Sequence, residues 1–181
     1  MSITLEQSEV MVDLETLGTK SNAVILSIGA ARFFPKEEGI MEHFEVFVDP
    51  ESCVRAGLVM DASTVMWWMH EDRDLARKEL MSCPRLQLPT ALAMFADWLK
   101  GDRPVWGNGG TFDNVILRNA YGACGITTPW KYWNDRCYRT MKSQYPDVKM
   151  LRKGTYHSAA ADAVSQAVHL QAIFRSISGD K

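Results

Sequence analysis

The sequence predicts an α/β fold, a mixed β-sheet whose first three strands are antiparallel and whose faces are covered by α-helices. Apolar segments separated by loops come first, and from residue 61 onward segments of helical spacing alternate with short apolar runs. This order of elements places helices against a sheet. The chain has 181 residues, 46% of them hydrophobic, which suffices to bury a core of its own. We expect a single domain over residues 1–181.

The N-terminal strands are predicted from apolar and β-branched composition. Such residues concentrate in three segments, Val10–Leu14, Ala23–Phe34 and His43–Val48. Loops that carry Gly18 and the turn Pro35–Gly39 separate these segments. Consecutive strands joined by loops of this kind form a β-meander.

Helices and a short strand are predicted in the middle of the chain. Asp61 stands where it can cap a helix that runs through Ser63–Met69. Apolar residues at helical spacing predict a second helix over Thr90–Lys100, which Gly101 ends. A short strand, Pro104–Trp106, then leads into a glycine-rich turn.

The last third of the chain continues the alternation. We expect a helix over Phe112–Tyr121 that ends at Gly122, and then a strand over Lys131–Asn134. The final helix, Ser158–Ser176, carries an apolar stripe rich in alanine. Three strands followed by alternating helices and strands are typical of a ribonuclease H-like fold.

Composition narrows the function classes. No apolar run approaches the roughly 18 residues that span a bilayer, and the first residues lack the apolar core of a secretory signal, so we expect a cytoplasmic protein. The cysteines at positions 53, 83, 124 and 137 lack the paired spacing of a zinc or redox site and are interpreted as reduced. A net charge of −2 gives no overall attraction to a polyanion, so a nucleic-acid substrate would need local basic groups and metal ions.

Acidic residues at the ends of predicted elements are the candidate site. In the segment VMVDLETLG, Asp13 and Glu15 follow an apolar strand two residues apart, and the two-residue period of a strand points both side chains to one face. Adjacent like charges there favour a bound cation. The alternative is that the strand has already ended and both acids face water.

Two further blocks carry acids. In WGNGGTFDNVIL, Asp113 lies in the first turn of a helix, where an acid also gains from the helix dipole. In YHSAAADA, His157 lies in a loop and Asp162 lies near the start of an alanine-rich helix. A helix with such small side chains can approach a sheet closely, which would bring Asp162 to the strand of Asp13 and Glu15. A surface position for His157 is the alternative.

These blocks together resemble the DEDDh 3′-to-5′ exonucleases, the DnaQ-like group of the ribonuclease H-like superfamily, which includes proofreading subunits, ribonuclease T and oligoribonuclease. The resemblance extends over nearly the whole chain. VMVDLETLG, STVMWWMHE and WGNGGTFDNVIL are most similar to small phage and prophage exonucleases and related bacterial exoribonucleases. The family divides by a Tyr or a His near the last acid. Position 158 is Ser, whereas His157 occupies the His position, which supports the DEDDh branch.

The resemblance implies the chemistry of a 3′-to-5′ exonuclease. Two divalent cations would be held by Asp13, Glu15, Asp113 and Asp162, and His157 would act as the general base. Oxygen ligands suit Mg²⁺ or Mn²⁺. The products would be nucleoside 5′-monophosphates, with RNA slightly preferred over DNA.

The resemblance also implies substrate contacts. Thr16, Leu17 and Gly18 follow the first acids, where the family contacts the terminal nucleotide. Asn108 is a further candidate. The alternative is that its side chain only forms hydrogen bonds within its own turn. Aromatic side chains can stack on bases, and core packing is the alternative for each of the three candidates, Trp67, Trp68 and Trp106. Because a helix cannot bury two adjacent tryptophans on one narrow stripe, Trp68 is taken as the candidate.

A basic span could guide the phosphate backbone. It lies between residues 135 and 153 and contains Arg136, Arg139, Lys142, Lys149, Arg152 and Lys153 against two acids. A solvated surface is the alternative. The expected partner is single-stranded or 3′-overhang nucleic acid, and the sequence leaves open whether the chain forms a homodimer.

Other functions are compatible with parts of this pattern. A phage-type 3′-to-5′ exodeoxyribonuclease would use the same acids, because the contact to a 2′-hydroxyl that distinguishes RNA from DNA is not visible in the sequence. A nucleic-acid-binding module that had lost catalysis would be indicated by a missing acid. A ribonuclease H or strand-transferase would cut internally and would not need His157.

Overall fold

The computed structural model describes residues 7–152, 154 and 157–179. Within these residues a six-stranded mixed sheet has the order β4-β3-β2-β1-β5-β6. The strands are β1 (Glu9–Thr16), β2 (Ile25–Phe33), β3 (Ile40–Val48), β4 (Arg85–Leu86), β5 (Val105–Gly107) and β6 (Asp135–Cys137). The first three are antiparallel to one another, as the meander predicted, and the three short strands are parallel to their neighbours. The predicted fold class is confirmed.

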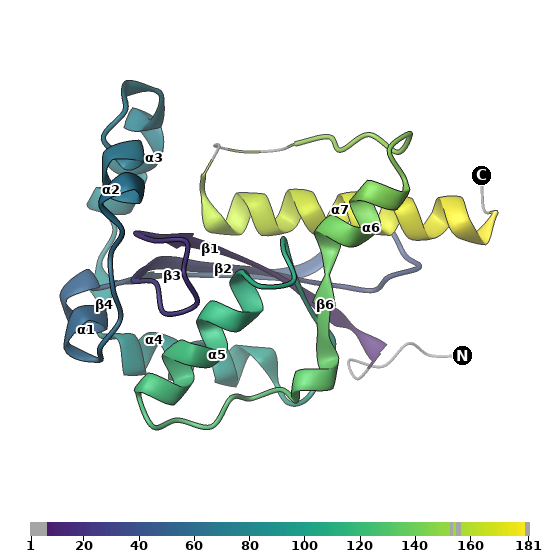
Figure 1. Cartoon of the computed structure of the whole chain (residues 1–181). Coiled ribbons are helices and arrows are strands. Elements are labelled where there is room, and N and C mark those ends of the chain that lie inside the picture. The colour runs from purple at the N-terminus through teal and green to yellow at the C-terminus, as the bar shows by residue number, and fades with distance from the viewer. Residues whose placement is uncertain (1–6, 153, 155–156, 180–181) are drawn as a thin grey trace.

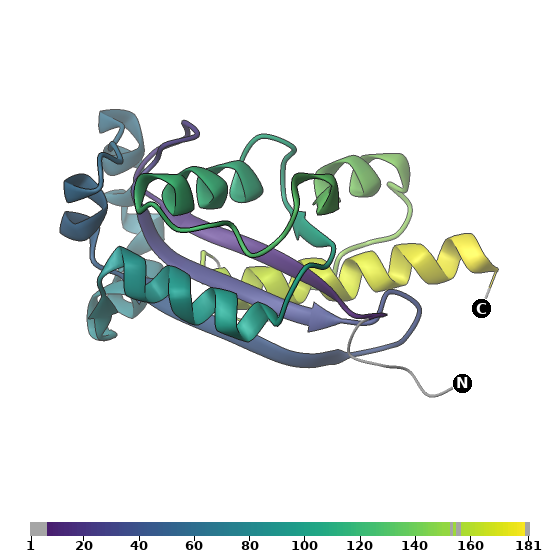
Figure 2. The same ribbon diagram turned by 90° about the horizontal axis from the view of Figure 1, so that it is seen from below.

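Helices cover both faces of the sheet (Figures 1 and 2). On one face lie α4 (Leu88–Leu99) and α5 (Asp113–Ala123), and on the other lie α6 (Tyr138–Gln144) and the long C-terminal α7 (Ala159–Ser178). The strand period of two divides β1 between these layers. Its Val10, Val12 and Leu14 join the core under α4 and α5, whereas Met11 joins the core under α7.

The C-terminal helix is tied to the far end of the sheet by a buried glutamine. The amide of Gln171 donates hydrogen bonds to the carbonyl oxygens of Phe34 and Gly39, at 3.0 and 2.9 Å. Both acceptors lie in the connection between β2 and β3. This contact fixes α7 near its C-terminal end.

A group of short elements follows β3 and lies at one end of the sheet (Figure 1). It comprises α1 (Pro50–Arg55), α2 (Ala62–Trp68), the 3₁₀ turn Glu71–Arg73 and α3 (Asp74–Ser82). Asp61 takes the N-cap position of α2, as predicted, but its carboxylate accepts the N–H of Thr19, at 3.0 Å, and no amide of its own helix. Neither α1 nor α3 was predicted.

The strand predicted over Lys131–Asn134 is wrong. Residues Tyr132–Asn134 form a 3₁₀ turn, and the strand β6 begins only at Asp135. The cause lies in Asp102, whose Oδ1 accepts hydrogen bonds from the Lys131 amide at 2.9 Å and the Asn134 side chain at 2.7 Å. These two bonds to one oxygen bend the segment. None of the helices in the described ranges has the length and hydropathy needed to pass through a membrane.

Candidate active site

Asp13 and Glu15 share the face of β1 that is turned toward α7. They alternate with Val12 and Leu14, which belong to the opposite core. Glu15 is buried, and Asp13 is partly buried and accepts a hydrogen bond from the amide of Gln166 on α7, at 2.7 Å. The strand therefore places both carboxylates in the layer between the sheet and the C-terminal helix.

A glycine on the neighbouring strand lets α7 approach these acids. Gly29 of β2 pairs with Asp13 across the sheet. A Cβ atom on Gly29 would lie 2.1 Å from the carbonyl carbon of Ala159, so the first turn of α7 rests directly on the backbone of β2. Asp162 follows one turn later and lies against β1, as the alanine-rich sequence led us to expect.

Asp113 reaches the site from the opposite layer. It is the first residue of α5 and is 1% exposed. Its Oδ1 accepts the Leu14 N–H at 3.1 Å, and its Oδ2 accepts the Asn108 N–H at 2.7 Å. Gly107 permits this packing, since a Cβ there would lie 3.0 Å from the Cβ of Asp113. Asp113 is thus bonded to both β1 and the turn after β5.

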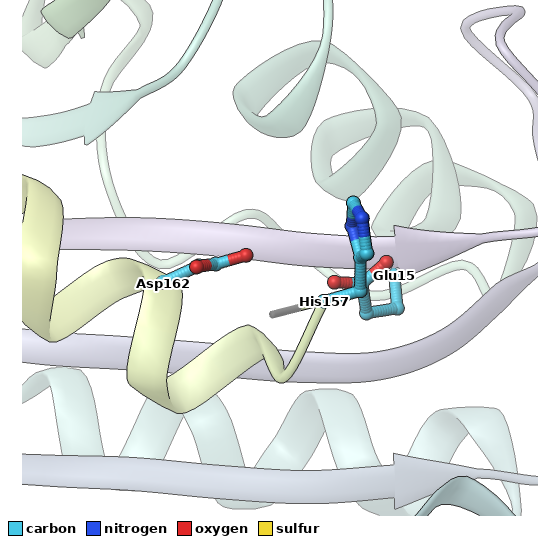
Figure 3. Close-up of side chains that lie close together, drawn as sticks. All are labelled: Glu15, His157 and Asp162. Carbon is cyan, nitrogen blue, oxygen red and sulfur yellow. The ribbon is translucent and has the colours of Figure 1, made fainter. Parts of the chain in front are cut away.

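His157 lies beside Glu15 and Asp162. One ligand atom from each of the three side chains falls within 4.8 Å of the others, and all three project into the space between β1 and the start of α7 (Figure 3). The backbone of His157 is left-handed, with φ of 62°. Its ring meets the edge of Trp67, with centroids 4.9 Å apart. The histidine is therefore held against α2 on one side and faces the acids on the other.

The protein environment disfavours four ionised acids at this site. Burial raises the pKa of Asp13 well above its usual range, and repulsion from the neighbouring acids adds to the effect. Burial and then repulsion from Asp162 raise the pKa of Glu15 to about 8. Burial raises the pKa of Asp113 to about 6, although its two amide donors stabilise the charged form, and burial also raises the pKa of Asp162. Added positive charge would favour ionisation of all four.

The histidine has the opposite shift. Burial lowers the pKa of His157, and the positive charge of Arg73 lowers it further, while Asp162 acts in the other direction. The neutral imidazole therefore predominates near neutral pH, where it can accept a proton.

The donor set fits divalent cations that prefer oxygen ligands. Glu15 and Asp162, with His157, form the compact cluster, and Asp13 lies beside it. The amide oxygen of Gln166 is buried without a hydrogen-bond partner among the described residues, which leaves an acceptor next to Asp13. Arg152 already forms an ion pair with Asp162, so a cation is part of this site. Carboxylate oxygens suit Mg²⁺ and Mn²⁺.

These groups surround a pocket of about 580 Å³, here called the main pocket. Of the predicted substrate residues, four line it: Thr16, Gly18, Trp68 and Asn108. Leu17 does not line it, and instead lines a smaller cavity on the other side of Trp68. Asp113 lies beneath the main pocket and does not reach its surface.

The three tryptophans have different environments. Trp67 is 39% exposed and lines the main pocket, whereas Trp68 is 5% exposed and its indole N–H donates to the Thr16 carbonyl oxygen at 2.8 Å. Trp106 is buried under α7 against Phe174 and does not line the pocket. Of the two tryptophans that line the main pocket, Trp67 is thus more exposed than the predicted candidate Trp68.

Only some residues of the basic span lie at the main pocket in the structure. Arg139 and Arg152 line the main pocket, whereas Arg136, Lys142 and Lys149 do not, and Lys153 lies outside the described residues. Sequence reasoning missed Gln166, which lies four residues after Asp162 on the same helix face, a spacing that could have indicated it. It also missed Phe112, which lines the pocket from the start of α5.

Comparisons with known proteins bear on the family and the fold of the chain. The family model described as the 3′-5′ exoribonuclease Rv2179c-like domain matches residues 8–174. No curated protein matches the chain. The fold is similar to the nuclease domain of 3′hExo, a DEDDh family member bound to rAMP, with a TM-score of 0.63, 12% identity and coverage of 98% of this chain and 96% of that one.

Two other solved structures have the same fold. For E. coli exonuclease I in complex with a dT13 oligonucleotide, the TM-score is 0.65 at 12% identity, over 96% of this chain and 43% of that one. For cell-death related nuclease 4 the TM-score is 0.54 at 12% identity, over 94% of this chain and 64% of that one. The chain therefore spans less than half of the exonuclease I chain.

Proposed function

Because the chain belongs to the family of Rv2179c-like 3′-5′ exoribonuclease domains and is a 3′-5′ exonuclease, we propose that it removes nucleoside 5′-monophosphates from the 3′ end of single-stranded RNA. The observation that carries this proposal is the convergence of a histidine and four acids, three of them buried and Asp13 partly buried, at one pocket and directly beneath it. They come from β1, α5, the segment before α7, and α7 itself.

The positions of the side chains support the following roles. Asp13, Glu15, Asp113 and Asp162 would hold two divalent cations, Mg²⁺ or Mn²⁺. When bound, these ions lower the pKa of water and stabilise negative charge on the phosphate and leaving oxygen. Gln166 holds the carboxylate of Asp13, and the amides of Leu14 and Asn108 hold that of Asp113.

His157 is proposed to be the general base. Its imidazole accepts a proton from the attacking water, whose oxygen forms a bond to the phosphorus as the bond to the 3′ oxygen of the preceding nucleotide breaks. That oxygen then takes up a proton, and the terminal nucleotide leaves with a 5′ phosphate. The lowered pKa of His157 supports this role, because the ring must be neutral before it can accept the proton.

The terminal nucleoside is proposed to lie between Thr16, Gly18 and Trp67. The hydroxyl of Thr16 donates to the Gly18 carbonyl oxygen at 2.7 Å, which fixes the shape of this wall. Stacking on a tryptophan contributes about 1–3 kcal/mol per base and accepts any base. Pocket residues with hydroxyl groups, Ser63 and Thr64 on α2, are candidates to recognise the 2′-hydroxyl of RNA.

The test is a time course on 5′-labelled and 3′-labelled single-stranded RNA and DNA of equal sequence, with Mg²⁺, Mn²⁺ or EDTA. Glu15→Gln is the inactive variant, because it removes a charge and keeps the side-chain shape. Glu51→Gln, on the exposed surface of α1, is the matched control.

We expect RNA to shorten from its 3′ end with metal, and to remain intact with EDTA or with Glu15→Gln. Faster degradation of DNA would favour the exodeoxyribonuclease instead. Internal cuts would rule out an exonuclease mechanism, and binding without cleavage under every condition would favour the non-catalytic module.

A further inference from the structure

A second cavity continues from the main pocket along α6. It has a volume of about 510 Å³ and is called the second pocket. Thr19, Phe112 and Arg139 line both cavities, so they form the boundary between them. Beyond that boundary the second pocket is lined by the turn after β5 and by Thr140 and Ser143 of α6.

The charge of the second pocket suits an anion. Among the residues that the structure describes, Arg139 is its one basic lining residue and no acidic residue lines it. Arg139 is exposed, and among the described residues nothing accepts a hydrogen bond from its guanidinium. Its carbon Cζ lies 3.6 Å from the place that a Cβ on Gly109 would occupy. The glycine therefore leaves room for this side chain beside the turn, and its donors are available to a ligand.

Two other cavities that adjoin the main pocket are less suited to a phosphate. The cavity that shares His157 with the main pocket is narrow, and it is lined by Glu45 and Glu79, which would repel a negative charge. The cavity that shares Trp68 with the main pocket is lined by Arg77 and Arg85 among apolar residues. Both arginines already donate hydrogen bonds to backbone carbonyl oxygens. Of these three cavities, the second pocket is thus the one whose charge and available donors match a nucleic-acid strand.

We propose that the second pocket binds the penultimate nucleotide of the strand, with Arg139 bound to the 5′ phosphate of that nucleotide. This inference rests on the proposed function, which places the terminal nucleotide in the main pocket and the scissile phosphate near the acids. Phe112, at the boundary, would then separate the last two bases. The ligand class is a phosphodiester of a single-stranded polynucleotide.

The position of Arg139 predicts which phosphate it recognises. A dinucleotide without a 5′ phosphate, NpN, offers only the scissile phosphate. The 5′-phosphorylated form, pNpN, offers a second phosphate that would lie in the second pocket. An arginine pair with a phosphate is charge-assisted and directional, so the second phosphate should strengthen binding by about tenfold.

The experiment compares the two dinucleotides by calorimetry in Mg²⁺. In both ligands the bridging 3′ oxygen is replaced by a methylene group, which prevents cleavage. Arg139→Ala is the test variant. Lys142→Ala is the matched control, because Lys142 lies on the same helix, is exposed and lines neither pocket.

In the wild-type protein and in Lys142→Ala, pNpN should bind about tenfold more tightly than NpN. In Arg139→Ala this difference should disappear, because the loss of affinity falls on pNpN far more than on NpN. Equal weakening of both ligands would place Arg139 at the scissile phosphate and overturn the proposal. An unchanged tenfold difference in Arg139→Ala would also overturn it.

A second pair of variants tests the pocket without removing Arg139. Thr140→Glu places a negative charge in the second pocket, and Gln144→Glu places the same charge elsewhere on α6. Only Thr140→Glu should weaken pNpN relative to NpN. A wild-type protein that degrades RNA from its 3′ end but binds both dinucleotides equally would overturn this inference alone, whereas a failure to degrade RNA would overturn the proposed function.

Discussion

The guanidinium of Arg152 forms an ion pair with the carboxylate of Asp162, one of the four acids proposed to hold metal ions. The positive charge of Arg152 acts to lower the pKa of Asp162, against the effect of burial. An incoming cation must compete with this arginine for the same carboxylate.

Removal of Arg152 should therefore change metal affinity in a definite direction. In Arg152→Ala, binding of Mn²⁺ without nucleic acid should tighten by several-fold, since the competing cation is gone. The measurement is calorimetric titration of metal-free protein. Lys149→Ala is the control, because Lys149 is exposed and donates to the Pro146 carbonyl oxygen, its one hydrogen-bond partner in the described part of the chain. Weaker Mn²⁺ binding in Arg152→Ala would instead mean that Arg152 holds Asp162 in position for the metal.

The metal-free protein should lose stability as pH rises. The carboxyl groups of Asp and Glu ionise near pH 4 in an unfolded chain, whereas the folded protein raises the pKa of Asp113 to about 6 and of Glu15 to about 8. Their stabilising contribution is complete below the unfolded values and is lost as pH rises through the folded values. Thermal melts in EDTA from about pH 5.5 to about pH 9 should show a falling Tm.

Glu15→Gln should lessen that fall at the alkaline end, because the group that ionises near pH 8 is absent. Added Mg²⁺ should restore the wild-type Tm at high pH more than at low pH, since the metal binds the ionised acids. An EDTA melt series independent of pH would contradict the raised pKa values.

Gly29→Ala should disrupt both stability and activity. The new methyl group would meet the backbone of Ala159 at 2.1 Å, so α7 must move away from β2 and carry Asp162 with it. Overpacking of this kind costs typically about 1–3 kcal/mol, which urea denaturation measures. Gly122→Ala is the control, because a Cβ there meets nothing within 4 Å and alanine favours a helix. Equal stability in both variants would contradict a direct contact between α7 and β2.

Substitution of each of the two adjacent tryptophans should have a different effect, one mainly on substrate binding and the other mainly on the stability of the fold. Trp67→Ala should raise KM and lower the free energy of unfolding less than Trp68→Ala does, because the Trp67 side chain is 39% exposed in the main pocket. Trp68→Ala should destabilise the fold by about 3–5 kcal/mol, because it removes a buried aromatic ring. Steady-state kinetics and denaturation on the same samples distinguish the outcomes. A raised KM in Trp68→Ala together with a destabilised fold in Trp67→Ala would instead indicate that Trp68 contacts the substrate.

His157→Asn tests whether the histidine is a base or a metal ligand. Asparagine tolerates the left-handed backbone found at this position, so the variant should fold. Loss of a general base should lower kcat by about 10²–10⁴-fold, with Mn²⁺ affinity unchanged. A loss of Mn²⁺ affinity in parallel with kcat would assign His157 to the metal site instead.

Much of this architecture has a local signature in the sequence. The two-residue spacing of Asp13 and Glu15 after an apolar strand predicted that both side chains point to one face, and the alanine-rich helix around Asp162 predicted a close approach to the sheet. Helix α3 gave no such signal, because it buries only Ala76 and Leu80 among charged residues.

Contacts between distant segments could not be predicted in this way. A strand was predicted over Lys131–Asn134, and the local sequence does not show that this segment forms two hydrogen bonds to the distant Asp102. Arg139 and Arg152 were part of an undivided basic span in the sequence. Which of its members reach the pocket depends on how the segment after β6 folds over the sheet.

The buried Gln171 gives α7 a second point of attachment, opposite to the one at Gly29. Asp162 and Gln171 are nine residues apart, or about 13 Å along the helix axis. Contacts on both sides of Asp162 thus hold the helix in place. The distance of Asp162 from β1 therefore depends partly on the β2–β3 hairpin, on the far side of the molecule. A change in the loop between β2 and β3 should consequently alter the spacing of the acids, although this loop contributes no side chain to the main pocket.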